Sequence, residues 1–256
     1  MFIVRIFKSF IIAFSMYSKV PMPMLEWKEE DMKYVFCFFP FIGVLIGGII
    51  TAWNYVCFRF ELPEICRVLI SAAIPLLVTG GIHADGFMDV SDAFRSYKSK
   101  EEKLKILKDP HIGAFSVIMF ALYGLIFAGA FSLLKDTRTV SVFSISFVIA
   151  RCLSAISSVS FKSAKEGTLS TFSKSSNVWA VRIVCILLML IAFAGMAFIN
   201  PVYGCVELIC AIGVFIYYYL KTKKELGGVT GDTAGFLVLI CEEFMLVGLA
   251  IVSLFF

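Results

Sequence analysis

Three aspartates at helical spacing are the side chains in this 256-residue chain that most directly indicate chemistry. Asp85, Asp89 and Asp92 stand at positions i, i+4 and i+7, so a helix would carry their carboxylates within about 60° of one another. Such a row repels itself, and oxygen ligands of this kind suit a hard divalent cation such as magnesium or manganese. The spacing alone equally allows a solvated acidic face, with Asp85 as a helix cap.

The residues just before these aspartates allow a break in the chain. Gly80 and Gly81 permit a bend or a close approach of two backbones. His83 stands two residues before Asp85, so a continuous helix would turn its imidazole away from the carboxylates. A helix interrupted at the glycines could bring it to them, and His83 is therefore a candidate general base.

A basic segment follows the acidic one. The stretch 98–108 predicts a short surface helix whose lysines could attract a phosphorylated substrate. Asp109 and the proline after it precede a long apolar run, a pattern that predicts a helix N-cap followed by proline at the first helical position. Asp109 is also a candidate catalytic residue.

An arginine stands in the middle of a later apolar segment. An ionisable residue at that depth normally faces the interior of a helix bundle or a polar cavity, so Arg151 is a candidate for substrate binding. Three glutamates in or near apolar segments are candidate partners for it, and the sequence does not choose among Glu207, Glu242 and Glu243.

A glycine-rich stretch, 227–235, opens the last apolar segment. Glycines at a helix N-terminus can cradle an anion, which makes Thr230 a candidate substrate-binding residue. The carboxylate of Asp232 instead favours a metal ligand or a cap. The loop 161–178 adds Lys162, Lys165 and Gly167 to these groups, and it adds Glu166 to the candidate substrate-binding residues. Its Ser- and Thr-rich end, 168–176, is expected to remain a loop.

The composition indicates what positions these groups. Apolar residues make up 60% of the chain and charged residues 16%, against about 45–50% and 25% in ordinary soluble domains. This excludes a disordered protein, a nucleic-acid-binding domain and a typical soluble enzyme, and it indicates one integral membrane domain over residues 1–256. The eight cysteines form no C-x-x-C pair, so they predict packing residues and neither a disulfide framework nor a zinc site.

Seven segments approach the ~20 apolar residues that a membrane-spanning helix needs. They are 35–57, 66–82, 113–134, 139–160, 179–199, 201–220 and 234–256. The segment 1–33 differs from them. In its first 14 residues, apolar side chains recur at helical spacing opposite Arg5, Lys8 and Ser9, which predicts a helix lying in the membrane interface and not a signal peptide. The apolar positions are Phe2, Ile3, Ile6, Phe7, Phe10, Ile11 and Phe14.

The distribution of positive charge predicts the orientation. Of the 23 Lys and Arg residues, 17 lie in the segments 1–33, 83–112, 161–178 and 221–233, and four lie in the alternate loops. Seven spans place all four positive segments on one side of the membrane, which the positive-inside rule makes cytoplasmic. The sequence therefore predicts an all-α polytopic bundle of about seven transmembrane helices plus an N-terminal interfacial helix. The N-terminus and the candidate site, in the loop 83–112 and its neighbours, would face the cytoplasm.

Four segments together resemble the cobalamin synthase family, the adenosylcobinamide-GDP ribazoletransferases. Gly80–Ala93 follows the family signature G-G-[LI]-H-x-D-G-[LF]-x-D-x-x-D-G, and Lys105–Gly113 follows E-[IV]-M-K-D-x-x-[IV]-G. Gly228–Gly235 follows G-x-[TS]-G-D-x-x-G ahead of an acidic helix, and Tyr17–Pro23 is similar to the family's T-R-[IL]-P segment. The similarity runs from about residue 10 to the end, in the family's order and spacing.

Two positions depart from the family pattern. Ala93 replaces a glycine after the third aspartate, and Lys105 stands where the family usually carries glutamate. Glu101 or Glu102 could supply a carboxylate from one helical turn earlier.

The resemblance implies a reaction and its requirements. The family joins adenosylcobinamide-GDP to α-ribazole or its 5′-phosphate, releases GMP and requires magnesium. A ribose hydroxyl attacks the phosphate attached to the corrinoid side chain. Cleaving a diphosphate needs charge neutralisation and in-line positioning more than a covalent nucleophile. The implied partners are these small molecules and a lipid bilayer, with no nucleic acid, and a homo-oligomer is left open. The implied location is the cell membrane.

The resemblance also gives roles to the candidate residues. The metal ligands would be Asp85, Asp89, Asp92 and Asp232. The charge on the departing GMP would be stabilised by Lys108, Arg95 or Arg151. The proton of the attacking hydroxyl would pass to His83 or to an aspartate.

Two other functions fit parts of the pattern. Asp89-x-x-Asp92 followed by Arg95 is faintly similar to the signature of membrane phosphotransferases of the CDP-alcohol type, although the rest of that signature is missing. A small-molecule transporter would also use buried charges such as Arg151, although no inverted repeat is evident.

Overall fold

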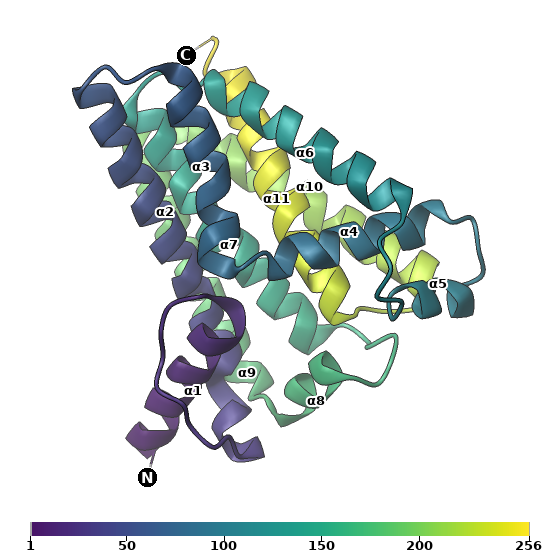
Figure 1. The fold of residues 1–256 in the computed structure, drawn as a ribbon. Coiled ribbons are helices and arrows are strands. Elements are labelled where there is room, and N and C mark those ends of the chain that lie inside the picture. The colour runs from purple at the N-terminus through teal and green to yellow at the C-terminus, as the bar shows by residue number, and fades with distance from the viewer. Residues whose placement is uncertain (1, 256) are drawn as a thin grey trace.

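The computed structural model describes residues 2–255, and within them every regular element is a helix (Figure 1). The side chains of Phe2, Ile3 and Thr168 lie outside the described part, as does Phe256 at the end of the last predicted span. The elements are α1 (Phe2–Tyr17), η1 (Glu29–Tyr34), α2 (Val35–Arg59), α3 (Glu64–Thr79), α4 (Ile82–Arg95), α5 (Lys100–Ile106), α6 (Ala114–Ser132), α7 (Thr137–Ser160), α8 (Thr168–Ser175), α9 (Val178–Ile199), α10 (Pro201–Leu226) and α11 (Gly231–Val252).

The bundle confirms the predicted all-helical fold. Six helices are long and apolar enough to cross a membrane: α2, with η1 before it, and α6, α7, α9, α10 and α11. The seventh predicted span is α3, which has 16 residues and meets α4 at a bend of 96°. The two ends of the chain lie at opposite ends of the bundle, as an odd number of crossings requires (Figure 1). The cytoplasmic orientation of the N-terminus stays a prediction.

The bend between α3 and α4 comes from the two glycines that the sequence singled out. Gly80 has φ +64° and ends α3, and Gly81 has φ +80° and begins α4. Both values are in the left-handed region, which glycine enters without the steric cost that a Cβ brings. Because of the bend, α4 runs across the bundle and not along it (Figure 1).

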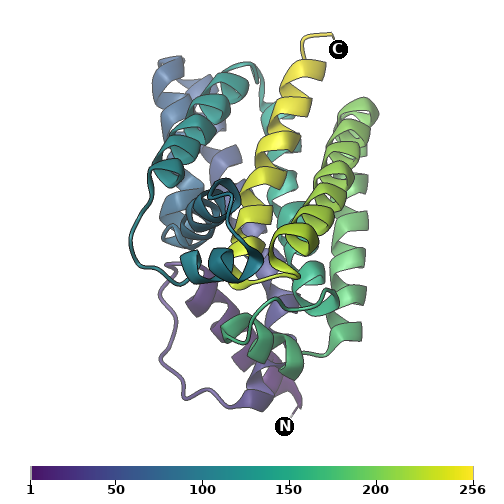
Figure 2. The same cartoon turned by 90° about the vertical axis from the view of Figure 1, so that its right-hand side faces the viewer.

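The centre of the bundle is built around α7 and α11. Gly43 and Gly47 of α2 face the backbone of α7 so closely that a Cβ at either position would overlap Phe147 O or Ser144 O. Small residues four apart on one helix are a common basis for such close crossings in membranes. Helix α11 stands between α6 and α10 and also packs on α4 and α7 (Figure 2).

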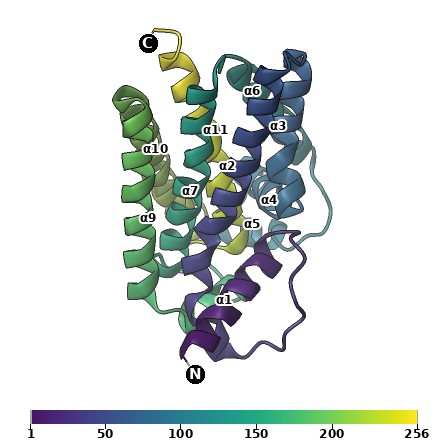
Figure 3. The ribbon, with the colours of Figure 1, turned by 90° about the vertical axis from the view of Figure 1, so that its left-hand side faces the viewer.

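The predicted N-terminal helix is present as α1. It lies beside the end of α2 that is nearer the N-terminus, with Ile12 and Ala13 buried and the Phe10 ring 5.6 Å from the Phe38 ring (Figure 3). Val4 and Phe7 stay exposed. An apolar face turned outward agrees with an interfacial position, which itself stays a prediction.

Two local predictions were wrong. The stretch 168–176 forms α8 and not a loop, because Phe172 packs into the bundle and compensates for the weak helix propensity of serine and threonine. Asp109 is not the N-cap of the following helix. Helix α6 begins at Ala114 with Gly113 as its N-cap, and the Asp109 carboxylate instead accepts hydrogen bonds from the backbone N–H (3.0 Å) and Nδ1 (2.6 Å) of His111.

Candidate functional site

The candidate site lies where the beginning of α4 crosses the beginning of α11. A Cβ on Gly86 would stand 2.7 Å from the carbonyl oxygen of Asp232. A Cβ on Gly235 would stand 3.1 Å from the carbonyl oxygen of His83. Each helix thus offers a glycine to the backbone of the other, and this contact brings the aspartate row of α4 to Asp232, almost 150 residues away in the sequence.

The carboxylates at this crossing are largely without partners. Within the described residues, the side chains of Asp85 and Asp89 make no hydrogen bond and no ion pair, whereas Asp232 accepts a hydrogen bond from Lys165 Nζ at 3.1 Å. Burial raises the pKa of Asp89 to about 6, helped by the neighbouring charges of Asp85, Asp232 and Asp92 and opposed by Lys165. The site therefore concentrates negative charge that a cation would stabilise.

Asp92 does a different task from the other members of the row. Its carboxylate accepts hydrogen bonds from the backbone N–H groups of Gly113 (2.8 Å) and Ser116 (3.0 Å) and from the Ser116 hydroxyl. These are N–H groups at the start of α6 that have no partner within their own helix. Asp92 thus caps α6 from another helix, and its predicted role as a metal ligand stays a prediction.

The carboxylates at the crossing fit a magnesium ion that substrate phosphates and water also bind. Among the described residues, no three His, Cys, Asp or Glu side chains converge as a ready-made metal site. Magnesium, however, is usually held by one or two carboxylates together with substrate phosphates and water. The unpartnered carboxylates of Asp85 and Asp89, with Asp232 beside them, can supply these carboxylate ligands.

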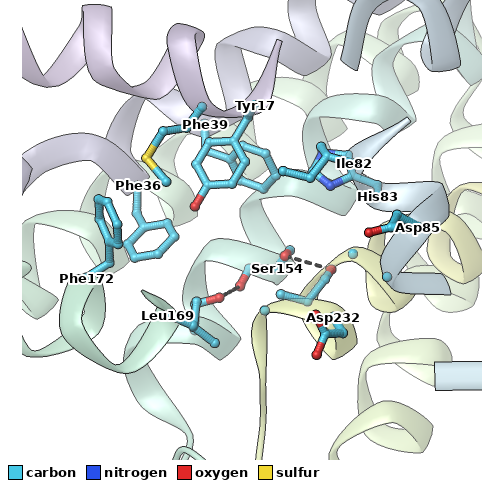
Figure 4. A pocket seen from close by; sticks show the side chains of 16 residues that line it. Tyr17, Phe36, Phe39, Ile82, His83, Asp85, Ser154, Leu169, Phe172 and Asp232 are labelled. Atoms are coloured by element: carbon cyan, nitrogen blue, oxygen red, sulfur yellow. Dashed lines mark hydrogen bonds between the residues drawn. The ribbon is translucent and has the colours of Figure 1, made fainter. Parts of the chain in front are cut away.

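A cavity of about 260 Å³ opens beside the carboxylates. We call it the aromatic cavity, because rings stand on one side of it while Asp85 and Asp232 stand on the other (Figure 4). The rings are Tyr17 from α1, Phe36 and Phe39 from α2, and Phe172 from α8.

A second cavity, of about 270 Å³, shares Asp232 with the first. We call it the lysine cavity, because Lys108 and Lys165 line it. The predicted substrate-binding residues Glu166 and Thr230 also line it. Thr230 caps α11 by accepting the N–H of Thr233 at 3.2 Å. Lysines around an open polar cavity suit an anion such as a phosphate group.

The break at the glycines comes before His83, so this residue lies on the same continuous helix as the aspartates, and it still lines a cavity together with Asp85. Its side chain lines the aromatic cavity, its exposed fraction is 6%, and its Nε2 has no hydrogen-bond partner among the described residues. Burial, with a contribution from Arg151, lowers the pKa of His83 to about 3. The imidazole is therefore neutral at pH 7, and its role as a general base stays a prediction.

Three other predicted residues, Arg151, Arg95 and Asp109, line neither of these two cavities. The Arg151 guanidinium is buried and donates to Glu242 Oε1 (2.6 Å) and Phe147 O (3.0 Å), which identifies Glu242 as its partner. Arg95 donates to the Met119 sulfur at 2.8 Å and lines a separate apolar groove. Asp109 is exposed. Their catalytic and substrate-binding roles stay predictions.

Several residues of the site were not singled out from the sequence. Lys165, which bridges Asp232 and the carbonyl oxygen of Leu107 (3.4 Å), was named from the sequence only as one polar group of its loop and was given no role. The rings that line the aromatic cavity were even harder to identify from the sequence, since apolar rings are expected throughout a membrane protein. Only Tyr17, within the Tyr17–Pro23 segment, had been marked by the family resemblance.

Comparisons with known proteins agree on one family. The family model described as cobalamin-5-phosphate synthase matches residues 9–250. A protein of Lachnoclostridium phytofermentans named adenosylcobinamide-GDP ribazoletransferase is 40% identical over 94% of this chain and 92% of its own length. Proteins of the same name from Clostridium perfringens and Clostridium botulinum are 33% and 32% identical, over 92% and 98% of this chain and 94% and 99% of their own lengths. No solved structure matches the chain.

Proposed function

The chain belongs to the cobalamin-5-phosphate synthase family, and on that premise we propose that it is an adenosylcobinamide-GDP ribazoletransferase of a membrane. It would join adenosylcobinamide-GDP to α-ribazole or its 5′-phosphate and release GMP. The observation that carries the proposal is the crossing of α4 and α11. There, the unpartnered carboxylates of Asp85 and Asp89 lie near Asp232 and Lys165. The crossing lies at the end of the bundle where the polar motifs of the sequence are found.

We further propose that magnesium takes part and that Asp85, Asp89 and Asp232 hold it. When bound there, the ion would neutralise charge on the diphosphate of the donor. Asp92 would contribute indirectly, because it fixes the start of α6 against α4 through Gly113 and Ser116.

The side chains around the crossing would divide the remaining tasks. Lys165 holds Asp232 at 3.1 Å and, with Lys108, offers positive charge to the phosphates in the lysine cavity. The attacking ribose hydroxyl would lose its proton to His83 or to one of the carboxylates, which lie at the edge of the aromatic cavity.

The location of the site follows from the charge distribution. The lysine-rich segments lie at the same end of the bundle as the N-terminus, so the positive-inside rule favours a cytoplasmic site in the cell membrane.

Neither a CDP-alcohol phosphotransferase nor a transporter gains support from the comparisons.

The experiment uses the purified protein in liposomes with adenosylcobinamide-GDP, α-ribazole phosphate and magnesium. We expect GMP and the coupled corrinoid in equal amounts, with both lost on adding a chelator and restored by excess magnesium. Absence of product under conditions where a family member is active would contradict the proposal. Turnover that survives chelation would contradict only the role of magnesium.

A further inference from the structure

The two walls of the aromatic cavity differ sharply in chemistry. Figure 4 shows the rings on one side and the carboxylates of Asp85 and Asp232 on the other. The Tyr17 and Phe39 rings lie 4.7 Å apart, and the Phe172 side chain is 5% exposed. Among the described residues that line this cavity, none is lysine or arginine. The rings therefore suit a flat uncharged group, whose face can stack on them.

The aromatic cavity holds one polar side chain whose buried atom has no partner. The hydroxyls of Ser154 and Ser158 also line it, but they already donate to Ala234 O (3.1 Å) and Ser154 O (2.8 Å). Nε2 of His83 makes no hydrogen bond among the described residues. The imidazole lies 5.5 Å from the Phe39 ring and 6.3 Å from the Tyr17 ring. A buried polar atom left unpaired is costly, so this one points to a ligand that pairs with it.

The lysine cavity is lined mainly by charged and polar side chains, in contrast to the ring side of the aromatic cavity. It meets the aromatic cavity at Leu169, Gly231 and Asp232, and it carries Lys108 and Lys165. A charged diphosphate is therefore favoured on one side of Asp232 and an uncharged ring system on the other.

We propose that the aromatic cavity binds the benzimidazole base of the acceptor nucleoside, while the lysine cavity binds the diphosphate of the donor. This inference rests on the proposed function. A benzimidazole nucleoside has a single free ring nitrogen, which matches the single unpaired Nε2 of His83. Guanine carries several donors and acceptors along its edges, and on the ring side of the cavity the described residues offer them only Nε2 of His83 and the Tyr17 hydroxyl. A corrin ring is several times larger than the base and does not fit in about 260 Å³.

This placement agrees with the bonds that change. The acceptor's ribose oxygen forms a bond to the corrinoid-linked phosphorus while the bond from that phosphorus to the oxygen of GMP breaks. The hydroxyl proton leaves to one of the carboxylates at the crossing, since Nε2 of His83 is already paired with the benzimidazole base, and GMP departs with the electron pair. Because both cavities border Asp232, an acceptor in one faces a phosphate in the other.

The test measures acceptor binding without the donor. Benzimidazole nucleosides fluoresce, so α-ribazole can be titrated with the protein in nanodiscs. We expect Phe172→Leu, which keeps an apolar side chain and removes the ring, to weaken binding about tenfold. Phe161→Leu is the matched control. Phe161 is half-buried, and its ring packs 5.5 Å from Phe215, but it lines neither cavity. Its Kd should stay within about twofold of the unmodified protein.

The second arm uses turnover and separates the two substrates. Phe172→Leu should raise KM for the acceptor and leave KM for the donor nearly unchanged. Lys108→Ala, at an exposed residue of the lysine cavity, should raise KM for the donor about tenfold and leave acceptor binding unchanged.

Two results would overturn the assignment: equal α-ribazole affinity in Phe172→Leu and the unmodified protein, or displacement of α-ribazole by guanosine. The proposed function fails separately, through absence of transfer. In that case, binding that still depends on Phe172 would support the cavity assignment by itself.

Discussion

Two helix crossings in this protein depend on glycine, and they lead to different results. At the first, Gly43 and Gly47 let α2 lie against the backbone of α7. At the second, Gly86 and Gly235 let α4 and α11 approach so closely that an added Cβ would stand 2.7 Å from Asp232 O or 3.1 Å from His83 O. The same device, a missing Cβ that allows close approach, is thus used twice.

The difference lies in the charges beside each crossing. Arg151, in the middle of α7, is 1% exposed and is paired with Glu242. At the crossing of α4 and α11, Asp85 and Asp89 have no hydrogen-bonding partner in the described part of the chain. Buried charges that are paired favour one fixed packing, whereas carboxylates held together without a partner favour binding of a cation or a substrate. We therefore regard the first crossing as scaffold and the second as site.

The largest expected effect comes from removing a carboxylate at the second crossing. Asp89→Ala should lower turnover by roughly 10³-fold or more, because it removes a carboxylate that we propose holds magnesium against the charge of the reacting phosphates. Its thermal denaturation should stay near that of the unmodified protein. GMP release measures the first quantity and a melting curve the second.

The control for Asp89→Ala is Glu61→Gln, at an acid in the loop between α2 and α3 at the opposite end of the bundle (Figure 1). It should leave turnover unchanged. Near-normal turnover in Asp89→Ala would remove the distinction between the two crossings.

The next effect concerns stability beside the first crossing. Glu242→Ala leaves the Arg151 guanidinium buried without its partner, which should cost about 3–5 kcal/mol of the free energy of unfolding. Denaturation in mild detergent measures it. Lys135→Ala breaks an exposed pair with Glu64 at 3.0 Å and should cost less than about 1 kcal/mol. Equal losses in the two variants would show that Arg151 is not held as described.

A substitution at the second crossing should affect activity more than stability. In Gly86→Ala the new Cβ meets the backbone of Asp232, which cannot rotate away, so α4 must move from α11. A shift near 1 Å in a reacting geometry costs about 10²-fold in rate. Gly124→Ala in α6 is the control, because a Cβ there meets nothing within 4 Å. Turnover that is lost only in proportion to folded protein would argue against a positioning role.

The smallest expected effect concerns a glycine at the first crossing. Gly47→Ala overpacks α2 against Ser144 of α7 and should lower the free energy of unfolding by about 1–3 kcal/mol. The turnover of the protein that remains folded should be unchanged. Gly48→Ala, at the neighbouring position where a Cβ has no contact within 4 Å, should be neutral or slightly stabilising. If Gly47→Ala instead lowered turnover at full stability, the first crossing would belong to the site.

Local pattern in the sequence determined the helices and where the chain bends. Apolar runs predicted the six helices that are long and apolar enough to cross a membrane, and the shorter α3, because crossing a bilayer requires a continuous apolar helix. Gly80 and Gly81 predicted the bend, since only glycine adopts positive φ without strain. The spacing of the aspartates predicted their common face. Each of these properties depends on residues close together in the chain.

The tertiary structure alone decided which groups meet. It paired Arg151 with Glu242 among three candidate glutamates, gave the Asp92 carboxylate to the start of α6, and set Lys165 against Asp232. It also gathered the rings of the aromatic cavity from α1, α2 and α8. Partner choice depends on where helices cross, and the crossing of α4 with α11 is set by a contact between Gly86 and the backbone of Asp232. Hydrophobic periodicity reports which face of a helix is buried, but it carries no record of the helix that buries it.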